Sequence, residues 1–199
     1  MKDRLKMAVP AVALLLGSFF LDSAAREIVQ IIKSPLLDHV MLWFSNAMTV
    51  IGVLVVIAAL FLYQEKKGRF IPTLLLSFIL SFLISNLLKL VFARERPVGM
   101  RHFTFSLFGI TASFPDYAFP SVHAATSFSV LPVLDKEFRK LKIFWIFFSV
   151  MVVISRIYLY EHYLSDVVAG MILGYFIGLV VLKAEVKYGI EKKFERLFQ

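Results

Sequence analysis

The sequence contains no cysteine and is poor in acidic residues. Its 199 residues include 14 Asp and Glu against 22 Lys and Arg, which gives a formal net charge of +8. The lack of cysteine excludes disulfide bonds, thiolate catalysis and cysteine-ligated zinc or iron–sulfur sites. In a soluble protein the positive charge would suggest nucleic-acid binding. Here the cations stand mostly in short segments between apolar blocks, so we predict no nucleic-acid partner.

Apolar residues are in excess and gather in long blocks. They make up 59% of the chain, whereas soluble domains are about half apolar. A helix needs about 20 apolar residues to cross a bilayer, and several blocks approach or reach that length. We therefore predict an all-α fold, a single integral membrane domain comprising residues 1–199. Its six predicted transmembrane helices are residues 7–21, 41–63, 71–92, 121–134, 143–160 and 163–182.

Two further segments have a helical pattern but too many charges to span. Residues 22–40 mix apolar and charged positions and are interrupted by Pro35, which is typical of an amphipathic helix in the membrane interface. Residues 183–199 are basic and periodic. We predict that they form a cytoplasmic surface helix.

The loop charges predict an orientation. Most Lys and Arg lie before the first span, after the second and fourth, and after the sixth. By the positive-inside rule, both termini are then cytoplasmic, in a cell-membrane protein. A cleaved signal peptide would also fit the basic start, the apolar stretch and the small residues at 23–25. Its loss would leave the orientation of the remaining spans unchanged.

Three polar clusters interrupt the apolar pattern at the predicted outer ends of the spans. Lys89 and Arg96 lie at the end of the third span, and residues 120–123 open the fourth. Residues 155–166 connect the fifth span to the sixth. Charged groups at such positions are unfavourable in a membrane and usually functional. The predicted topology brings all three clusters to the extracytoplasmic face.

The residue types in these clusters are suited to binding a phosphate group. Lys89, Arg96 and Arg156 would place three cations at head-group depth, and arginine binds phosphate oxygens in a bidentate manner. Ser121 and the backbone amides that follow it, including that of Val122, open a predicted helix. The N-terminus of a helix favours an anion.

The clusters also contain candidates for nucleophilic catalysis. His162 and Asp166 are four residues apart, so they share a helical face. Asp166 could accept a proton from one ring nitrogen and leave the other free to attack. His123 could then protonate the departing oxygen.

Each of these residues also has an ordinary structural explanation. Lys89 could extend to the interface, a lone histidine is more often packed than catalytic, and Arg156 could pair with Glu161 or Asp166. Their placement together on one face favours function over several independent structural roles.

At these positions the sequence resembles the type 2 phosphatidic acid phosphatase superfamily. The family pattern is K-x6-R-P, then P-S-G-H, then S-R-x5-H-x3-D. The first and third parts match in full, and the motifs cover residues 89–166. In the second part Val122 replaces the family's glycine. Glycine permits unusual dihedral angles, so this substitution puts the local backbone path and the shape of the pocket in question.

The resemblance implies a role for each matching residue. His162 would form a phosphohistidine, Asp166 would orient it, and His123 would serve as acid and then activate water. Lys89, Arg96, Ser121, Val122 and Arg156 would hold the phosphate. The family needs no metal or other cofactor.

The resemblance also implies lipid substrates taken from the bilayer. Members act on undecaprenyl diphosphate, phosphatidylglycerol phosphate, phosphatidic acid or lipid A phosphates. The small size of the chain favours undecaprenyl diphosphate. The oligomeric state is not indicated. Residues 93–119 are expected to shape the head-group entrance, with Arg94, Arg101, His102 and Asp116 as candidates without assigned roles.

Two other functions fit parts of the pattern. A metal-dependent hydrolase could use His123, His162 and Asp166 as ligands, although three nearby cations would oppose a divalent ion. A transporter or binding protein for anionic lipids would need the cations but not the two histidines.

Overall fold

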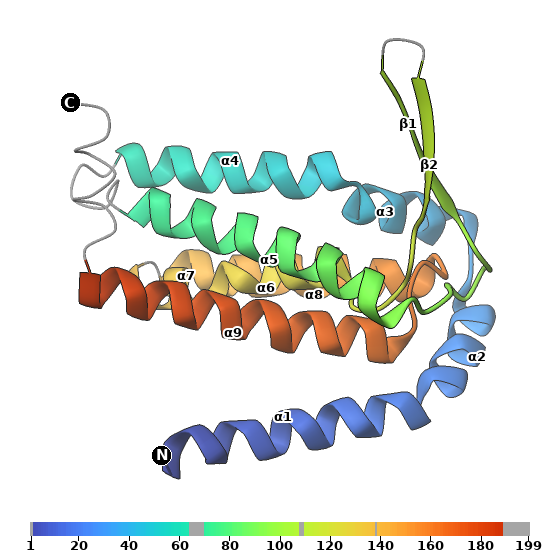
Figure 1. Ribbon diagram of the computed structural model, residues 1–199, viewed down its shortest axis with the longest axis horizontal. Helices are drawn as coiled ribbons and strands as arrows, with labels where there is room; N and C mark the ends of the chain where they lie inside the picture. The colour runs from blue at the N-terminus through green and yellow to red at the C-terminus, as the bar shows by residue number, and fades with distance from the viewer. Residues whose placement is uncertain (1, 64–69, 108–109, 138, 189–199) are drawn as a thin grey trace.

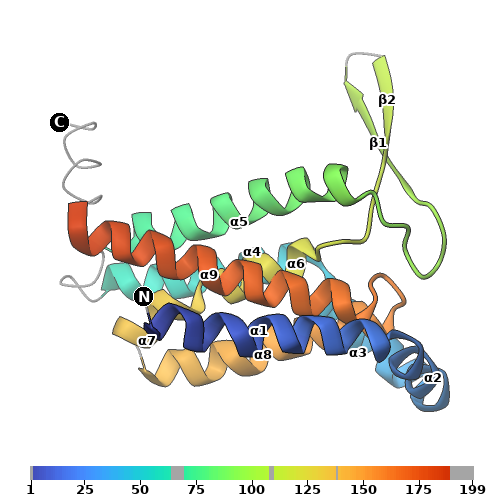
Figure 2. The same cartoon turned by 60° about the horizontal axis from the view of Figure 1, so that its bottom comes forward.

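The protein is a bundle of helices with one projecting β-hairpin. The computed structural model describes residues 2–63, 70–107, 110–137 and 139–188. The long helices lie side by side, and the hairpin stands across their direction at one end (Figure 1; Figure 2). The elements, in order, are α1 Lys2–Phe20, α2 Asp22–Ile32, α3 Pro35–Ser45, α4 Ala47–Tyr63, α5 Ile71–Phe92, β1 His102–Leu107, β2 Ile110–Pro115, α6 Val122–Ser129, α7 Leu131–Glu137, α8 Arg139–Tyr158 and α9 Leu164–Tyr188.

Three described helices are long and apolar enough to cross a membrane. They are α5, the Leu141–Tyr158 part of α8, and α9. Helices α3 and α4 meet the same criteria only as a pair, bent by 55° at a short break. The Val9–Phe20 part of α1 is apolar but shorter. Length and composition thus support three spans, or four with the bent pair, and the six-span topology stays a prediction.

The breaks in two predicted spans have local causes. Predicted span 41–63 is interrupted at Asn46, whose side-chain oxygen accepts a hydrogen bond from the Met48 amide at 2.8 Å and so caps α4. Predicted span 121–134 is divided between α6 and α7 near Pro132. Proline has no amide hydrogen to donate to the preceding turn.

The segment 22–40 contains two helices. Pro35 does not simply interrupt a helix but begins α3, the position where proline is best tolerated. Ser34 caps α3 by accepting a hydrogen bond from the Leu37 amide at 3.4 Å. The interfacial location of this segment stays a prediction. Of the predicted tail helix 183–199, residues up to Tyr188 extend α9, and 189–199 lie outside the described residues.

The hairpin is a departure from the all-α prediction. Strands β1 and β2 pair antiparallel, with His102 opposite Pro115 and Leu107 opposite Ile110. The alternation of apolar and polar residues at 102–107 is typical of a strand. It lies within residues 93–119, the segment expected to shape the entrance.

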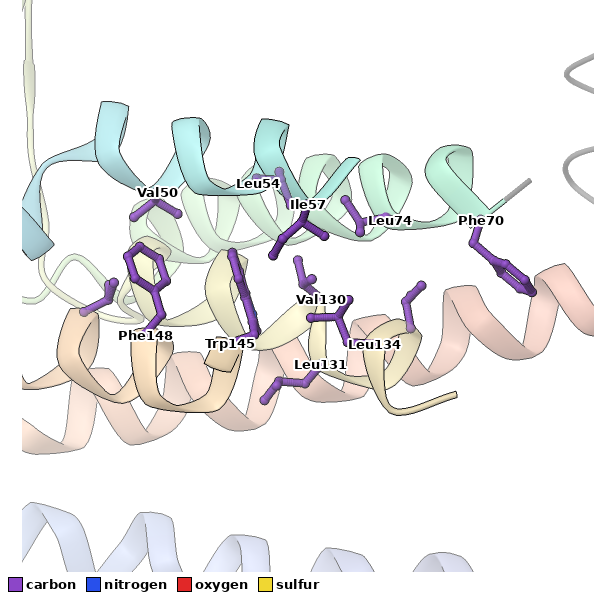
Figure 3. Packing of buried hydrophobic residues seen from close by; sticks show 12 residues of the cluster. Val50, Leu54, Ile57, Phe70, Leu74, Val130, Leu131, Leu134, Trp145 and Phe148 are labelled. Carbon is purple, nitrogen blue, oxygen red and sulfur yellow. The ribbon is translucent and has the colours of Figure 1, made fainter. Parts of the chain in front are cut away.

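An apolar core joins α4, α5, α7 and α8. Val50, Leu54 and Ile57 of α4 face Trp145 and Phe148 of α8 (Figure 3). The indole nitrogen of Trp145 is satisfied by the Ser127 carbonyl at 2.6 Å, which ties α8 to α6. This core fixes the helices in place while leaving one end of the bundle to polar residues.

Helices α6 and α9 approach each other closely because of three glycines. A Cβ atom at Gly174 would lie 2.0 Å from the Ala125 carbonyl oxygen, and one at Gly170 would lie 2.5 Å from that of Ser121. Gly178 is equally tight against α6. Small residues allow such contact between membrane helices. The contact places the start of α6 beside the start of α9.

Candidate active site

The residues of the three sequence clusters gather at one end of the bundle. It is the end opposite to the one where α1 begins and α9 ends (Figure 1). Lys89 lies in the last turn of α5, Ser121 caps α6, and Asp166 lies in the first turn of α9. Arg96 and His162 lie in the connecting segments.

A left-handed residue ends helix α5 and directs the basic residues that follow it back toward the bundle. Ala93 adopts a left-handed conformation with φ of 45°, and its amide donates to the Lys89 carbonyl at 2.9 Å. The chain then turns, so that Arg94 reaches the first turn of α9 and Arg96 reaches the α8–α9 connection.

Lys89 and Arg96 are buried and share one acidic partner. Lys89 Nζ donates to Asp116 Oδ1 at 2.9 Å, and Arg96 Nη2 donates to Asp116 Oδ2 at 2.8 Å. Burial favours a raised pKa for Asp116, but the hydrogen bonds and charges of Lys89 and Arg96 outweigh it and lower the pKa. Asp116 is therefore ionised at neutral pH.

Glu161 is the second acid of the site. Its Oε2 accepts from Arg96 Nη1 at 2.7 Å and lies 3.5 Å from Arg156 Nη2. Its Oε1 accepts from Arg101 Nη1 at 2.5 Å. Arg156 also donates to the hydroxyl and carbonyl of Ser45, the last residue of α3. The α3–α4 break thus provides polar contacts for a buried arginine.

A tight turn after α8 places His162 next to Arg156. Tyr160 has a positive φ of 56°, and the amides of Glu161 and His162 both donate to the Arg156 carbonyl, at 3.0 and 3.1 Å. His162 is only 2% exposed. Burial, followed by the charges of Arg156 and Arg96, lowers its pKa well below the ordinary value. Its imidazole is therefore neutral at neutral pH, as a nucleophile requires.

The predicted His162–Asp166 pair is close but is not a hydrogen bond. His162 Nδ1 lies 3.6 Å from Asp166 Oδ2, beyond hydrogen-bond range. Among the described residues, Nδ1 has no hydrogen-bond partner. Asp166 Oδ2 instead accepts from the Tyr163 amide at 2.8 Å. A small closing movement would be needed to form the predicted contact.

Arg94, which is itself paired with Asp22, holds Asp166 from the other side. Arg94 Nη1 donates to Asp166 Oδ1 at 2.6 Å, and Arg94 Nη2 donates to Asp22 Oδ2 at 2.8 Å. Asp22 also accepts from the amide and hydroxyl of Ser165, at 2.8 and 2.7 Å. Arg94 lies over the Tyr163 ring, 4.2 Å from its centroid. The orientation of Asp166 therefore depends on α2.

The start of α6 tolerates valine where the family pattern has glycine. Val122 is the first residue of α6, where the backbone is helical. A helical conformation is available to valine, so no glycine-specific dihedral angle is needed. The Ser121 hydroxyl accepts from the Ala124 amide at 3.5 Å, and the Ser121 amide donates to the Asp166 carbonyl at 3.0 Å. His123 follows in the first turn, half-buried.

A shallow surface depression beside α2 reaches His162. Asp22 and Arg26 of α2 line it together with Pro97 and Tyr163. Within the described residues, no group of three or more His, Asp or Glu is placed to hold a metal ion.

A model of the PAP2 superfamily matches residues 71–189. The chain belongs to the PAP2 superfamily. Because members of this family are phosphatases, the chain is a phosphatase, as its motifs predicted. The match covers every residue of the three clusters but begins after α2 and α3.

Two characterised relatives resemble this PAP2 protein in sequence. An undecaprenyl-diphosphatase from Sulfolobus acidocaldarius is 29% identical over 144 residues, which are 72% of this chain and 68% of the relative. A lipid A 1-phosphatase from Rhizobium etli is 29% identical over 134 residues, which are 65% of this chain and 55% of the relative.

Two crystal structures share its fold. A transmembrane PAP2-type phosphatidylglycerolphosphate phosphatase from Bacillus subtilis superposes with a TM-score of 0.68 at 24% identity, covering 94% of this chain and 98% of its own. Aquifex aeolicus LpxE gives a TM-score of 0.57 at 22% identity, covering 79% and 92%. The membrane fold of this PAP2 protein is therefore confirmed.

Four residues that the structure places in the site were assigned no role there from the sequence. Arg94 and Asp116 were candidates for the entrance only, Glu161 was considered only as a structural partner of Arg156, and Asp22 was not considered. Most of their partners lie at least 20 residues away in sequence, and Asp22 and Ser165 are 143 residues apart. The only available signal was charge at the edges of apolar blocks.

Proposed function

We propose that this PAP2 protein removes a phosphate group from a membrane lipid through a phosphohistidine on His162. The observation that carries the proposal is the meeting of three buried cations, two histidines and Asp166 at one end of a membrane bundle. Lys89, Arg96 and Arg156 would hold the phosphate together with the Ser121 hydroxyl and the Val122 amide.

The reaction would proceed in two balanced steps. In the first, a ring nitrogen of neutral His162 bonds to phosphorus while the bond to the lipid oxygen breaks, and His123 gives that oxygen a proton. In the second, His123 takes a proton from water, whose oxygen bonds to phosphorus and releases His162 as inorganic phosphate forms. Asp166 would orient His162 by closing the present 3.6 Å separation.

The favoured substrate is undecaprenyl diphosphate, with phosphatidylglycerol phosphate, phosphatidic acid and lipid A phosphates as alternatives. The Sulfolobus relative carries the first activity in its name, and the Rhizobium relative the last. Identities of 29% support the class of substrate more strongly than any single lipid.

The proposed topology has six spans. They are α1, the end of α3 together with α4, then α5, the broken pair α6–α7, α8 and α9. Both termini would be cytoplasmic, and α2 with the start of α3 would lie in the interface of the cell membrane. The site would then face the extracytoplasmic side, and the lipid would enter sideways from the bilayer.

The decisive experiment is phosphate release from a panel of pure lipids by the purified full-length chain. The panel contains undecaprenyl diphosphate, phosphatidylglycerol phosphate, phosphatidic acid and lipid A. We expect turnover of at least one lipid in the presence of a chelator, and acid-labile radiolabelled phosphate trapped on His162.

Three results would contradict parts of this proposal. Full turnover by His162→Ala on every lipid would exclude the phosphohistidine. Loss of activity with chelator, restored by a divalent ion, would favour the metal-dependent hydrolase. Binding of lipids without turnover of any would favour a transporter or binding protein.

A further inference from the structure

Every phosphate-binding cation proposed above already has an acidic partner in the structure. Asp116 bridges Lys89 and Arg96, and Glu161 lies between Arg96 and Arg156. Neither acid belongs to the motif pattern that the chain shares with its family. A site built to bind an anion therefore contains two anions of its own.

The Asp116 carboxylate makes the contacts that a bound phosphate would make. One oxygen lies 2.9 Å from Lys89 Nζ and the other 2.8 Å from Arg96 Nη2. Phosphate oxygens bind lysine and arginine at similar distances. Two anions cannot occupy one position, so a phosphate can bind between these cations only after the carboxylate has left.

The Asp116 side chain reaches the surface, whereas its main chain is held by hydrogen bonds. The side chain is 36% exposed, against 10% for Lys89 and 4% for Arg96. The Asp116 amide donates to the Arg101 carbonyl at 2.7 Å, and its carbonyl accepts from Arg96 Nε at 3.0 Å. Rotation of the side chain toward solvent leaves both backbone contacts intact.

Glu161 is held differently. Its side chain is only 16% exposed, and three arginines surround it. The Glu161 carbonyl also accepts from Arg96 Nη1 at 2.8 Å. These contacts fix Glu161 as a part of the frame that positions Arg96 and Arg156.

We propose that Asp116 is a built-in counter-anion of the phosphate site, and that the terminal phosphate of a lipid monophosphate or diphosphate replaces it between Lys89 and Arg96. This inference rests on the proposed function and concerns its selectivity. A terminal phosphate group carries close to two negative charges at neutral pH, whereas a phosphodiester carries one. Exchange for the carboxylate gains charge only with the terminal phosphate. Asp116 thus discriminates against the phosphodiester lipids that surround the site.

The test measures binding of inorganic phosphate to the purified full-length chain in detergent, by isothermal titration calorimetry at pH 7. We expect Asp116→Asn to bind phosphate at least threefold more tightly than the wild type, because no carboxylate has to be displaced. Asp116→Glu keeps the charge and should stay within twofold of the wild type. Glu161→Gln removes a charge from the same cluster but should not gain affinity.

Two results would contradict the proposal that Asp116 is a counter-anion. Equal or weaker phosphate binding by a folded Asp116→Asn would mean that Asp116 orients the cations. An equal gain in phosphate affinity in Glu161→Gln would mean that removing any negative charge from the site strengthens phosphate binding. If Asp116→Asn shows no cooperative thermal transition, Asp116→Ser takes its place with the same expected gain.

The same experiment separates this inference from the proposed function. Absence of phosphate binding in the wild type and in all variants would overturn the phosphate site itself and the counter-anion with it. A second measurement addresses selectivity: inhibition of turnover by phosphatidylglycerol, a phosphodiester lipid, in mixed micelles. We expect Asp116→Asn to be inhibited at least threefold more strongly than the wild type. Equal inhibition would contradict the discrimination.

Discussion

At the scale of single residues, the environment of His162 determines its protonation. The imidazole is buried and surrounded by Arg156, Arg96 and Lys89, and all of these effects lower its pKa from the ordinary value of 6.5. A group with a lowered pKa remains neutral above that lowered value. His162 should therefore stay neutral at pH values where an ordinary histidine is already charged.

We predict that His162 titrates below pH 6.5. The measurement is a pH titration of ¹⁵N-labelled histidine side chains by NMR, with His162→Gln used to assign the signal. Arg96→Gln removes one cation and should raise the midpoint toward the ordinary value. A midpoint at or above 6.5 in the wild type would contradict the influence of burial and charge described here.

Arg94 provides a second prediction at this scale. Arg94→Gln removes the charged contact with Asp166 and Asp22, so Asp166 should no longer be held in place. We expect kcat to fall about ten- to a hundredfold, the equivalent of about 1.5–3 kcal/mol for a charged hydrogen bond. KM should change much less, because Arg94 does not contact the proposed phosphate position.

The control for Arg94 lies at the opposite end of the bundle. Lys142 forms a surface pair with Asp135 at 2.5 Å, and Lys142→Gln should leave kcat near the wild-type value. Arg94→Lys retains the charge and should recover part of kcat. A fall in thermal stability with unchanged kcat in Arg94→Gln would assign Arg94 a structural role only.

At the scale of elements, the bounds of helix α5 could be predicted from the sequence, whereas the helices that it contacts could not. Its predicted bounds, residues 71–92, are those of the structure because an unbroken apolar block ends at charged residues. Its buried face carries a small polar residue at every fourth position, namely Thr73, Ser77, Ser81 and Ser85. The next position in this series is Lys89. Hydropathy cannot tell which helix such a face contacts.

Other elements were changed by local effects that average hydropathy does not detect. The Asn46 cap divides one predicted span, and Pro132 lies at the break in another. The hairpin was missed because average hydropathy does not register the alternation of apolar and polar residues at 102–107. The motif residues, by contrast, were predicted to lie on one face because their charges stand out in apolar surroundings, and the structure brings them to one end of the bundle. Their roles stay predictions.

The contact between α6 and α9 gives a prediction at this scale. Gly174→Ala would place a Cβ atom 2.0 Å from the Ala125 carbonyl, so the helices must separate. We expect destabilisation of about 1–3 kcal/mol, as for other overpacked interiors, measured as a lower thermal midpoint in detergent.

A matched glycine in α4 serves as control. Within the part of the chain that the structure describes, no atom beyond the neighbouring helical backbone lies within 4 Å of a Cβ placed at Gly52. Gly52→Ala should therefore be neutral or stabilising by up to about 1 kcal/mol, since alanine favours the helix. Equal destabilisation by both substitutions would show that backbone effects, and not the α6–α9 contact, are responsible.

At the scale of the whole molecule, the proposed orientation can be tested directly because the chain has no cysteine. Ser113→Cys places a thiol on the exposed hairpin at the site end, and Lys187→Cys places one on an exposed position at the other end of α9. In right-side-out membrane vesicles, a membrane-impermeant maleimide should label Cys at 113 and not Cys at 187. The reverse pattern would invert the proposed topology.

The contacts of α2 and α3 with the site affect which parts of this enzyme could be exchanged with a relative. Asp22 of α2 holds Arg94, and Ser45 at the end of α3 holds Arg156. Both partners lie outside residues 71–189, the stretch that defines the family. That stretch carries the proposed reacting groups and Arg94, but it contains neither Asp22 nor Ser45. We therefore expect a chimera that exchanges only this stretch between relatives to lose activity unless it also carries matching versions of α2 and α3.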